Sequence, residues 1–541
     1  MVAPSSPARR WLGLIAIAAG VALIVVDTTI VNVIVPPMIE DIGISSVQVQ
    51  WIQESYAIVL AALLLLAGRF ADLLGARRVF IAGVAVFGAT SVVAGLAPTG
   101  EWLILARFLQ GVGAAMILPT SLALLNATFT GKERGQAFAV WGSTIGAAAA
   151  LGPLLGGWLA EHASWRWAFG INVPLSALIV AGAFAWLAPS PSSRGRVDAV
   201  SGVLSVLGVG LLAFGLVEGR TYGWITTIRP LEVWGFSWSG GPSPVLLALG
   251  LSVLVLQVFF RRQKALTRGD GAGDGAGALM DVRLFSIASF RNGNVVTVII
   301  GLGEFGIIAV LPLWLQFTLG YSALQAGLAL VPLAVGSFVA SGASFGMTTK
   351  VSPLDQVRIG LVLEVVALVW LGLMAATDSS WWSIALVLFL YGIGVGFATA
   401  QVTHVVLAEV PEHSAGQASG MQSAFRELGA ALGIAVLTTV FFTTLSADLR
   451  AGLTRIEVPA AQAEEFTRAV TDSAGAAIGP LAADPGTVPV ADAADAAMTL
   501  SIAIGSYVAA GLIALGLVAT VLISPARPTR AVRERADTVR S

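Results

Sequence analysis

Seven ionisable side chains stand inside long apolar stretches of the sequence. They are Asp27, Glu54, Arg107, Glu304, Glu364, Arg426 and Glu427. A charged group at the centre of a bilayer costs about 2.5 to 3.5 kcal/mol on insertion scales, so such a residue usually lines a cavity or pairs with another group. A carboxylate in an apolar cavity can bind a proton or an organic cation, and the two then compete for it. Such competition would couple the movement of one to that of the other.

The stretches that hold these residues have the length of membrane spans. The 541-residue chain is 56% hydrophobic and only 11% charged, and its mean hydropathy is +0.86. This composition lies far outside the range of soluble domains. Apolar runs of about 18 to 25 residues occur fourteen times, the seventh over 201–217. We therefore expect an all-α integral membrane protein. The first run is too long for a signal peptide and contains Asp27, so we interpret it as an uncleaved span.

The basic residues predict the orientation of these spans. Most of the 30 lysines and arginines fall in connections on one side, which the positive-inside rule assigns to the cytoplasm. This distribution requires an even number of spans, with both termini cytoplasmic.

An internal repeat divides the chain. FLQGVG at 108–113 recurs as FLYGIG at 389–394, which indicates two related bundles around a central cavity. The predicted domains are an N-terminal six-helix bundle (1–200), two inserted membrane helices (201–260), a cytoplasmic linker (261–290), a C-terminal six-helix bundle (291–523) and a cytoplasmic tail (524–541). The second bundle includes a polar outer loop over 446–498, in which a short helix is possible.

A glycine-rich segment surrounds a proline in the middle of the fifth span. GAAAALGPLLGG contains Gly146, Gly152, Pro153, Gly156 and Gly157. A proline inside a helix removes a backbone hydrogen bond and kinks the helix, while the glycines leave a smooth face for close packing. We interpret this span as a helix that bends or pivots.

Four segments together resemble motifs of the major facilitator superfamily. GAAAALGPLLGG is similar to its antiporter motif, and GRFADLLGARR at 68–78 is similar to its cytoplasmic gate motif. RFLQGVGAA at 107–115 resembles its fourth-helix motif. DTTIVNVIVP at 27–36 resembles the first-helix signature of the fourteen-span drug:H+ antiporters. The motifs occur in the expected order and cover nearly the whole chain, although the second half lacks the spaced Asp and Gly of the gate motif.

The resemblance implies roles for the gate residues. Gly68 and Gly75 would allow close helix approach. Asp72 would meet a helix N-terminus or an arginine across the domain interface, and Arg77 and Arg78 would anchor the loop.

The resemblance also implies roles for the buried charges. Asp27, Glu54 and Glu427 match positions that carry acidic residues in quaternary-ammonium exporters. Asp27 with Arg107 is the expected proton-coupling site, and Glu54 and Glu427 are expected to be acidic residues of the substrate cavity. Glu304 has no family motif behind it, but it is central in the ninth span and is a further candidate for an acidic residue of that cavity.

Structural interpretations of the same residues stay open. Asp27 could simply hydrogen-bond a neighbouring helix. Arg107 is expected to pair with a carboxylate across the bundle, either as a switch or as a structural tie. Glu54 could be a solvated residue at the mouth of the cavity, and Glu364 is expected to be structural. Arg426 and Glu427 are adjacent and point about 100° apart on a helix, which favours separate partners.

The function implied is proton-coupled export of amphipathic, cationic compounds by alternating access. The transporter would be a monomer in the bacterial plasma (inner) membrane, with a small amphipathic molecule, protons and the lipid bilayer as its partners and no nucleic acid. Export of an endogenous lipid or secondary metabolite is an alternative, and a non-transporting sensor or scaffold on this fold is another.

Other chemistry finds little support in the sequence. The chain has no cysteine and only three histidines, which lack metal-ligand spacing, so we expect no metal site and no cofactor. It contains no GxxxxGK[ST] phosphate loop and no catalytic constellation, so we expect neither ATP hydrolysis nor another enzymatic activity.

Overall fold

The chain folds almost entirely into helices. The computed structural model describes residues 6–44, 46–190, 192, 196–233, 236–268, 278–347, 350–411 and 414–522. Parts of the predicted linker and the whole predicted tail therefore lie outside the described residues. In the described part, 14 helical segments are long and apolar enough to cross a membrane.

The membrane-crossing segments follow one another along the chain. They are α1 (Pro7–Val33), α3 (Ser46–Leu74), α4 (Ala76–Gly95), α5 (Gly100–Thr128), α6 (Gly131–His162), α7 and α8 together (Trp167–Gly170 and Asn172–Trp186), α9 (Ala199–Tyr222), α10 (Pro244–Arg268), α11 (Ala288–Phe317), α12 (Ala323–Met347), α13 (Pro353–Met374), α14 (Trp381–Leu407), α15 (Ala415–Arg455) and α18 (Val488–Ala519). The shorter elements are α2 (Val35–Ile42), the strands β1 (Leu231–Val233) and β2 (Phe236–Trp238), η1 (Val282–Ser286), α16 (Ala460–Asp472), α17 (Ile478–Ala483) and η3 (Thr520–Leu522).

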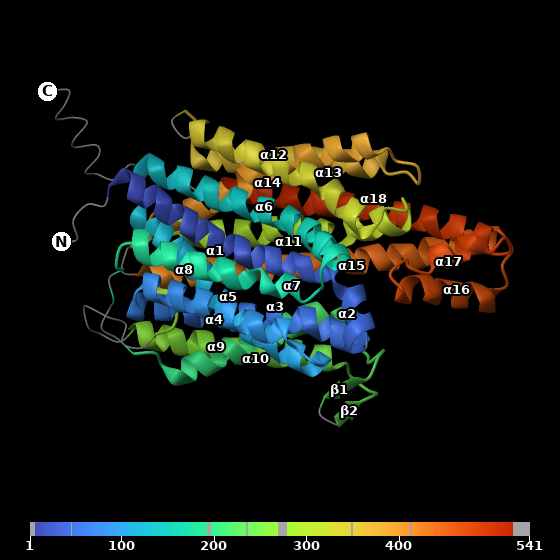
Figure 1. Cartoon of the computed structure of the whole chain (residues 1–541), viewed down its shortest axis with the longest axis horizontal. Helices are drawn as coiled ribbons and strands as arrows, with labels where there is room; N and C mark the ends of the chain where they lie inside the picture. Colours follow the sequence, from blue (N-terminus) through green and yellow to red (C-terminus); the bar gives the residue numbers. More distant parts are fainter. Residues whose placement is uncertain are drawn as a thin grey trace.

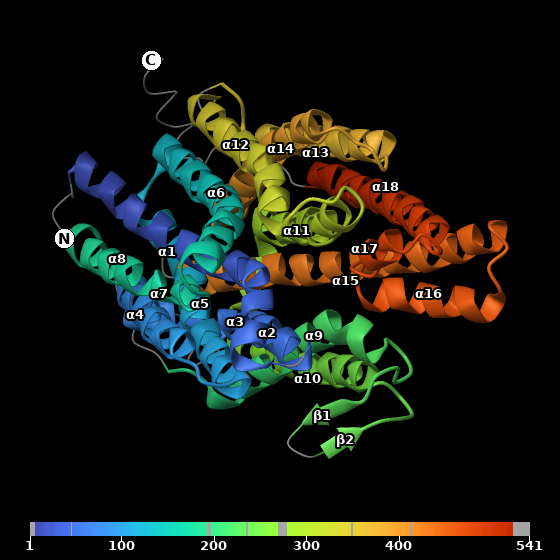
Figure 2. The same ribbon diagram turned by 45° about the vertical axis from the view of Figure 1, so that its right-hand side comes forward.

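The long helices form two bundles with an inserted pair beside them (Figure 1). Helices α1 and α3 to α8 make the first bundle, and α11 to α15 with α18 make the second. The bundles meet where α6 packs on α12 and where α3 packs on α15. Helices α9 and α10 pack on each other, and α9 also contacts α3 and α15. The inserted pair therefore lies along one seam between the bundles, a position that Figure 2 shows from a second side.

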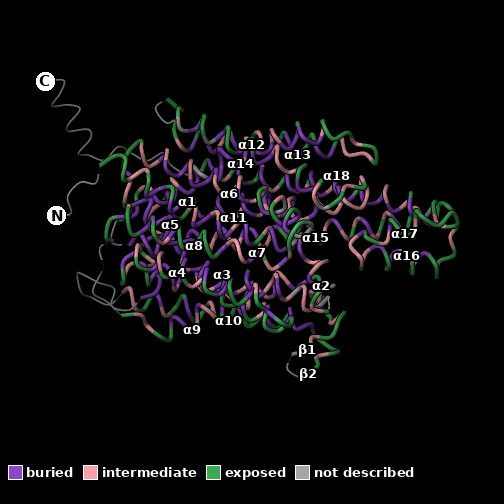
Figure 3. The backbone as a smooth tube through the Cα atoms, viewed as in Figure 1, coloured by how far each residue is buried: buried purple, intermediate pink, exposed green. Residues whose placement is uncertain are grey.

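The burial pattern fits helices that pack against each other on one side and face lipid on the other. Buried and exposed stretches alternate along the helices in Figure 3. Large apolar side chains stay exposed, such as Leu178 and Phe338. Because a helix satisfies its backbone hydrogen bonds internally, it can present such an apolar face to hydrocarbon.

The two ends of the bundle can be told apart. With an even number of spans, α1 begins and α18 ends at one end, which we call the terminal face. The β1–β2 hairpin, paired Leu231 to Trp238, lies between α9 and α10 at the opposite end, which we call the hairpin face.

The structure changes two boundaries expected from the sequence. The polar segment 446–498 is mostly helical, since α15 runs on to Arg455, α16 and α17 follow, and α18 begins at Val488. The seventh span does not end at residue 217, because α9 continues to Tyr222. This extension brings Glu218 into the helix.

Candidate functional site

Asp27 on α1 and Arg107 on α5 form an ion pair inside the first bundle. Their side chains are 0% and 1% exposed. The Arg107 guanidinium also donates from Nε to the backbone oxygen of Ile52 over 3.0 Å and lies 4.3 Å from the ring centroid of Tyr56. The sequence-based prediction that Arg107 pairs with a carboxylate within the bundle is confirmed.

Neutral polar groups complete this cluster. Asn172 at the start of α8 donates to Asp27 Oδ1 over 2.7 Å, and Gln110 donates to the same oxygen over 3.3 Å. Gln110 Nε2 also donates to Ser91 Oγ on α4 over 2.8 Å. Four helices thus enclose one carboxylate with a cation and two amides, which favours the ionised form of Asp27. Sequence reasoning missed these amides, although Gln110 lies one helical turn from Arg107.

Glu54 on α3 contacts a second acidic residue that sequence reasoning missed. It shares a side-chain hydrogen bond with Glu218 on α9, which is 0% exposed. Aromatic rings surround the contact, since Trp51 stacks on Phe214 at 6.4 Å between ring centroids. Two carboxyl groups in direct contact cannot both be ionised, so this pair holds at least one proton. The predicted end of the seventh span at 217 excluded Glu218 from consideration.

Glu304 on α11 is buried in the second bundle. It accepts a hydrogen bond from Thr399 Oγ1 on α14, 2.9 Å from Oε1 and 3.2 Å from Oε2. Glu304 lines a small cavity of about 10 Å³ together with Arg426 on α15. The two charged groups share this cavity but form no ion pair within 4.0 Å in the described part of the chain.

Arg426 and Glu427 face different surroundings, as their adjacency predicts. The Arg426 guanidinium lies 5.6 Å from the ring centroid of Trp141 and 5.7 Å from that of Phe305. Glu427 instead lines an apolar pocket of about 310 Å³ between α3, α9, α10 and α15, whose wall includes Leu65 and Phe259. This volume lies at the lower end of the range for small-molecule sites. Glu427 is the only charged residue among the described residues that line the pocket.

Glu364 on α13 is fully buried, and neither of its carboxyl oxygens has a hydrogen-bond partner among the described residues. Its Cγ packs closely against Gly394 of α14. A buried carboxyl without a cation or a donor favours the neutral, protonated form.

The gate residues join the two bundles at the terminal face. Asp72 at the end of α3 accepts hydrogen bonds from the backbone N–H groups of Gly416 over 2.7 Å and Gln417 over 2.9 Å. These groups begin α15, so the carboxylate binds the positive end of a long helix. A Cβ on Gly68 would lie 2.6 Å from the Gly416 oxygen, which shows how closely the helices approach. The predicted contact of Asp72 with a helix N-terminus across the domain interface is therefore present.

The other gate residues shape the turn after α3. Gly75 has φ +91°, a backbone conformation that favours glycine and lets the chain reverse into α4. Arg77 donates from Nη2 to the oxygen of Phe184 over 2.8 Å near the end of α8. Arg78 is exposed to solvent, so of the two arginines it is Arg77 that ties the turn to the bundle.

The glycines of α6 lie at two helix contacts. A Cβ on Gly152 would come within 3.0 Å of the Val26 oxygen on α1, and one on Gly146 within 2.9 Å of Ser337 Oγ on α12. Gly156 and Gly157 are buried as well. The helix is continuous from Gly131 to His162 and includes position 153. The close packing expected of these glycines is thus present, and pivoting of the helix stays a prediction.

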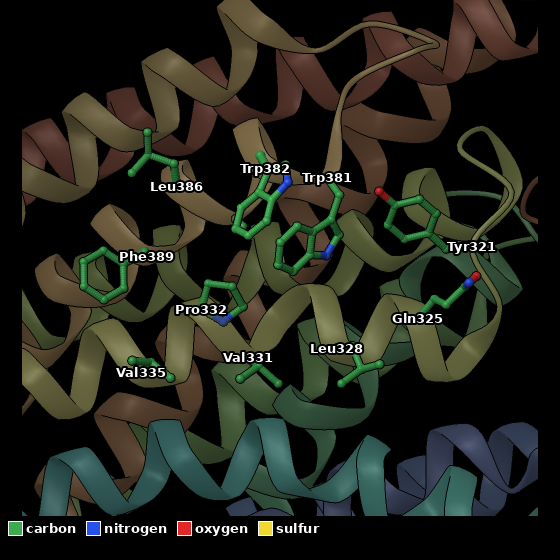
Figure 4. A pocket seen from close by; sticks show the side chains of 11 residues that line it. Tyr321, Gln325, Leu328, Val331, Pro332, Val335, Trp381, Trp382, Leu386 and Phe389 are labelled. Atoms are coloured by element: carbon green, nitrogen blue, oxygen red, sulfur yellow. The ribbon is translucent and has the colours of Figure 1, made fainter.

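One cavity in the described part of the chain contains none of these residues. This groove of about 840 Å³ runs between α12 and α14, and Trp381 and Trp382 lie between Phe389 on one side and Tyr321 on the other (Figure 4). Their rings meet edge to face with centroids 4.5 Å apart. No acidic or basic side chain of the described residues lines the groove. It therefore suits apolar molecules and offers nothing that would select a charged one.

No group of three or more His, Cys, Asp or Glu side chains that could hold a metal ion occurs among the described residues.

Proteins named as an efflux pump, a transporter and a resistance protein are similar to most of the chain. The Multidrug efflux pump LfrA of Mycolicibacterium smegmatis is 31% identical over 515 residues, which cover 94% of this chain and 95% of that protein. The Probable actinorhodin transporter of Streptomyces coelicolor is 32% identical over 478 residues (85% and 78% coverage). The Puromycin resistance protein pur8 of Streptomyces alboniger is 33% identical over 447 residues (80% and 82% coverage).

A solved structure shares the fold. The human organic anion transporter MFSD10 (TETRAN) superposes with a TM-score of 0.61 at 14% identity, covering 94% of this chain and 99% of that one. The family described as Major Facilitator Superfamily matches residues 17–434. With its two six-helix bundles and an inserted helix pair, the chain therefore belongs to the Major Facilitator Superfamily.

Proposed function

We propose that the protein exports amphipathic, cationic drugs or toxic compounds across the bacterial plasma membrane in exchange for protons, by alternating access. Membership of the superfamily makes it a transporter rather than an enzyme. The names of its relatives, which include a multidrug efflux pump and an antibiotic resistance protein, support export of toxic compounds. The terminal face would be the cytoplasmic one, since most basic residues of the connections lie there.

The observation that carries the proposal for cations is the position of Glu427. Its carboxylate lines an otherwise apolar pocket of about 310 Å³ at the seam between the bundles and the inserted pair. An amphipathic cation matches such a wall, because its apolar body buries surface against side chains such as Leu65 and Phe259 while its charge meets the carboxylate. A neutral molecule would gain the burial of apolar surface but not the attraction to the carboxylate.

The observation that supports proton coupling is the pair of Asp27 and Arg107. An ion pair sealed inside a bundle resists opening as long as both groups are charged. Protonation of Asp27 would remove that attraction and free Arg107, so that α1 and α5 could shift relative to each other. A proton entering from the hairpin face would in this way favour a different arrangement of the first bundle.

The gate residues support alternating access. Asp72 at the N-terminus of α15, with Gly68 close to Gly416, closes the terminal face between α3 and α15. Loss of these contacts would open the path to the cytoplasm. We expect the protein to work as a monomer, because each proposed site is completed within one chain.

A direct test uses purified protein in liposomes. An imposed pH gradient should drive uphill movement of a quaternary ammonium compound, and a proton ionophore should stop it. A neutral lipid and a neutral drug serve as comparison substrates. Uphill transport that is indifferent to the pH gradient would contradict proton coupling, and preference for the neutral compounds would contradict the cationic substrate.

A second function has its own support. The similarity to a probable actinorhodin transporter favours export of a secondary metabolite that the cell itself makes. The same liposome assay with an aromatic anionic or neutral metabolite would distinguish this alternative. A sensor or scaffold would differ from both, since changing acidic residues to amides would leave its phenotype intact.

A further inference from the structure

Arg426 is a cation of the second bundle that rests on an aromatic ring of the first. It extends from α15, and its guanidinium lies 5.6 Å from the ring centroid of Trp141 on α6. Phe305 on α11, at 5.7 Å, faces it as well. Arg426 is 8% exposed, and no carboxylate of the described residues lies within 4.0 Å of it. Among the described residues this buried cation therefore contacts aromatic faces instead of an ion-pair partner.

Glu304 provides that alternative partner in the same cavity. Glu304 and Arg426 line one space of about 10 Å³, which is the size of a single water molecule. The described side chains give Glu304 only the Thr399 hydroxyl as a hydrogen-bond donor. Without a cation in contact, a carboxyl group buried this deeply keeps its proton.

The charged and titratable groups around the cavity also favour the protonated state of Glu304. Glu364 on α13 and Tyr391 on α14 interact electrostatically with Glu304, and neither can compensate a negative charge. Glu427 on α15 interacts with Arg426 from the lateral pocket. Arg426 is therefore the group that can decide whether Glu304 is ionised.

Trp141 ties the position of Arg426 to the arrangement of the bundles. Its indole Nε1 donates to Ser121 Oγ on α5 over 3.1 Å, so the ring is fixed within the first bundle. Trp141 is 0% exposed and stands ten residues, about 15 Å, from the start of α6 at the terminal face. If the bundles part at that face, the ring moves away from Arg426.

Polar side chains connect Glu304 to the terminal face. Thr403 lies one helical turn beyond Thr399 toward the end of α14, and Gln422 lies one turn before Arg426 toward the start of α15. Gln422 Nε2 donates to Thr403 Oγ1 over 3.2 Å, and both residues line the cavity. Hydroxyl and amide groups therefore lie on the terminal side of Glu304, whereas apolar side chains such as Ile300 lie beside it. A proton that leaves Glu304 meets the polar groups on the terminal side.

We propose that Arg426 exchanges Trp141 for Glu304 when the terminal face opens, and that this exchange expels the proton of Glu304 to that face. In the closed arrangement Glu304 is a neutral carboxylic acid and Arg426 lies against Trp141. In the open arrangement Arg426 pairs with the Glu304 carboxylate, and the proton passes to water at the terminal face. The inference rests on the proposed proton-coupled export, for which it supplies a second proton site and the device that empties it.

Infrared spectroscopy of the full-length protein in lipid nanodiscs tests the exchange without any substrate. The carbonyl band of protonated carboxylic acids is recorded at pH 7, and the part that Glu304→Gln removes is assigned to Glu304. Trp141→Leu should abolish most of that part, because Arg426 loses its ring and pairs with Glu304. Trp141→Phe keeps a ring and should retain the band. The double variant Trp141→Leu/Arg426→Gln should regain it.

Opening the gate provides an independent arm. Asp72→Asn weakens the contact with the start of α15 and should also reduce the Glu304 band while Trp141 is intact. Because the chain has no native cysteine, spin labels at Lys132→Cys and Lys350→Cys can report the distance across the terminal face in each variant. Trp141→Leu should lose the band even in molecules whose labels show a closed face.

Three results would overturn the inference. The first is a wild-type spectrum with no band that Glu304→Gln removes. The second is a Glu304 band that survives in Trp141→Leu. The third is a Glu304 band that survives in Asp72→Asn molecules whose spin labels show an open terminal face. Failure of this inference can be distinguished from failure of the proposed function, since a protein that does not transport cations in liposomes can still show the exchange of Arg426 between Trp141 and Glu304.

Discussion

The two bundles treat their buried acidic residues in opposite ways. In the first, Asp27 meets Arg107, Asn172 and Gln110, so its negative charge is compensated. In the second, Glu304 accepts a hydrogen bond from a threonine hydroxyl, and the part of the chain that the structure describes offers no hydrogen-bond partner to either oxygen of Glu364. One site therefore stabilises a carboxylate and the other a carboxylic acid, although all three residues are buried in apolar helices.

This difference teaches that burial alone does not assign a proton role. In the proposed mechanism an incoming proton would break the ion pair of Asp27, whereas Glu304 and Glu364 lie in surroundings that favour the protonated form and would need a cation in contact to lose a proton. A transporter with both kinds of site can take up a proton in one bundle and release one from the other as the bundles rearrange.

The largest effect is expected at the compensated site. Asp27→Asn should abolish uphill transport driven by a pH gradient in liposomes, because an amide cannot exchange a proton with Arg107. Asp27→Glu keeps the charge and should retain part of the activity. Asp41→Asn is the matched control, since Asp41 pairs with Arg166 on the exposed surface. Uphill transport by Asp27→Asn at the normal rate would remove Asp27 from the coupling mechanism.

A stability measurement contrasts the two kinds of site directly. Arg107→Gln leaves a buried carboxylate without its cation and should lower the free energy of unfolding by about 3 to 5 kcal/mol. Glu364→Gln replaces a neutral acid by a neutral amide of the same shape and should change it by less than about 1 kcal/mol. Thermal unfolding in detergent, followed by tryptophan fluorescence, compares the two. A large loss for Glu364→Gln would mean that Glu364 is ionised and has a cationic partner.

Much of the fold could be predicted from the sequence, because membrane spans leave a strong signal. The length of the apolar runs predicted the membrane-spanning helices, and the recurrence of FLQGVG as FLYGIG predicted the two bundles. The spacing of Asp72 and Gly68 in a recognised motif predicted the contact with a helix N-terminus. These features depend on local composition or on motifs that a single sequence displays.

The partners within the sites were harder to predict. Glu218 was missed because this acidic residue itself ended the apolar run that predicted the seventh span. In the structure, α9 continues through Glu218. The donors to Asp27 come from α5 and α8, far apart in sequence, and only tertiary packing brings them together. Glu427 was expected to line the substrate cavity, and the structure places it in a pocket beside the inserted helices, whose part in that pocket was not foreseen. The side of a helix that faces each neighbour cannot be deduced from its composition when nearly every residue is apolar.

Variants of the acidic residues at the seam would distinguish recognition of a cationic substrate from proton coupling. Glu427→Gln should weaken efflux of a quaternary ammonium compound about tenfold or more and affect a neutral drug far less, because a cation loses its partner in a low-dielectric pocket. Glu54→Gln should do the same if its contact with Glu218 receives the cation. Asp27→Asn, by contrast, should affect both drugs alike. A resistance or liposome panel measures all three, and equal losses for both drugs at Glu427 and Glu54 would make these carboxyl groups structural or shared proton sites.

The smallest effect is expected at an acidic residue outside the membrane spans. Asp198 caps the start of α9 and pairs with Arg262 of α10, Oδ2 lying 2.6 Å from Nε. The hydrogen bond from Arg262 holds the pKa of Asp198 below its usual range. A carboxylate with a lowered pKa in the folded state stabilises the protein above its unfolded pKa of about 3.9, and this contribution is lost as the pH falls further. Because Arg262 is partly exposed, Asp198→Asn should cost less than about 1 kcal/mol at pH 7. Unfolding of wild type and variant, compared at pH 7 and below pH 4, should show the difference shrinking toward acid. A difference that persists in acid would mean that Asp198 acts through packing and not through its charge, because an asparagine also caps a helix.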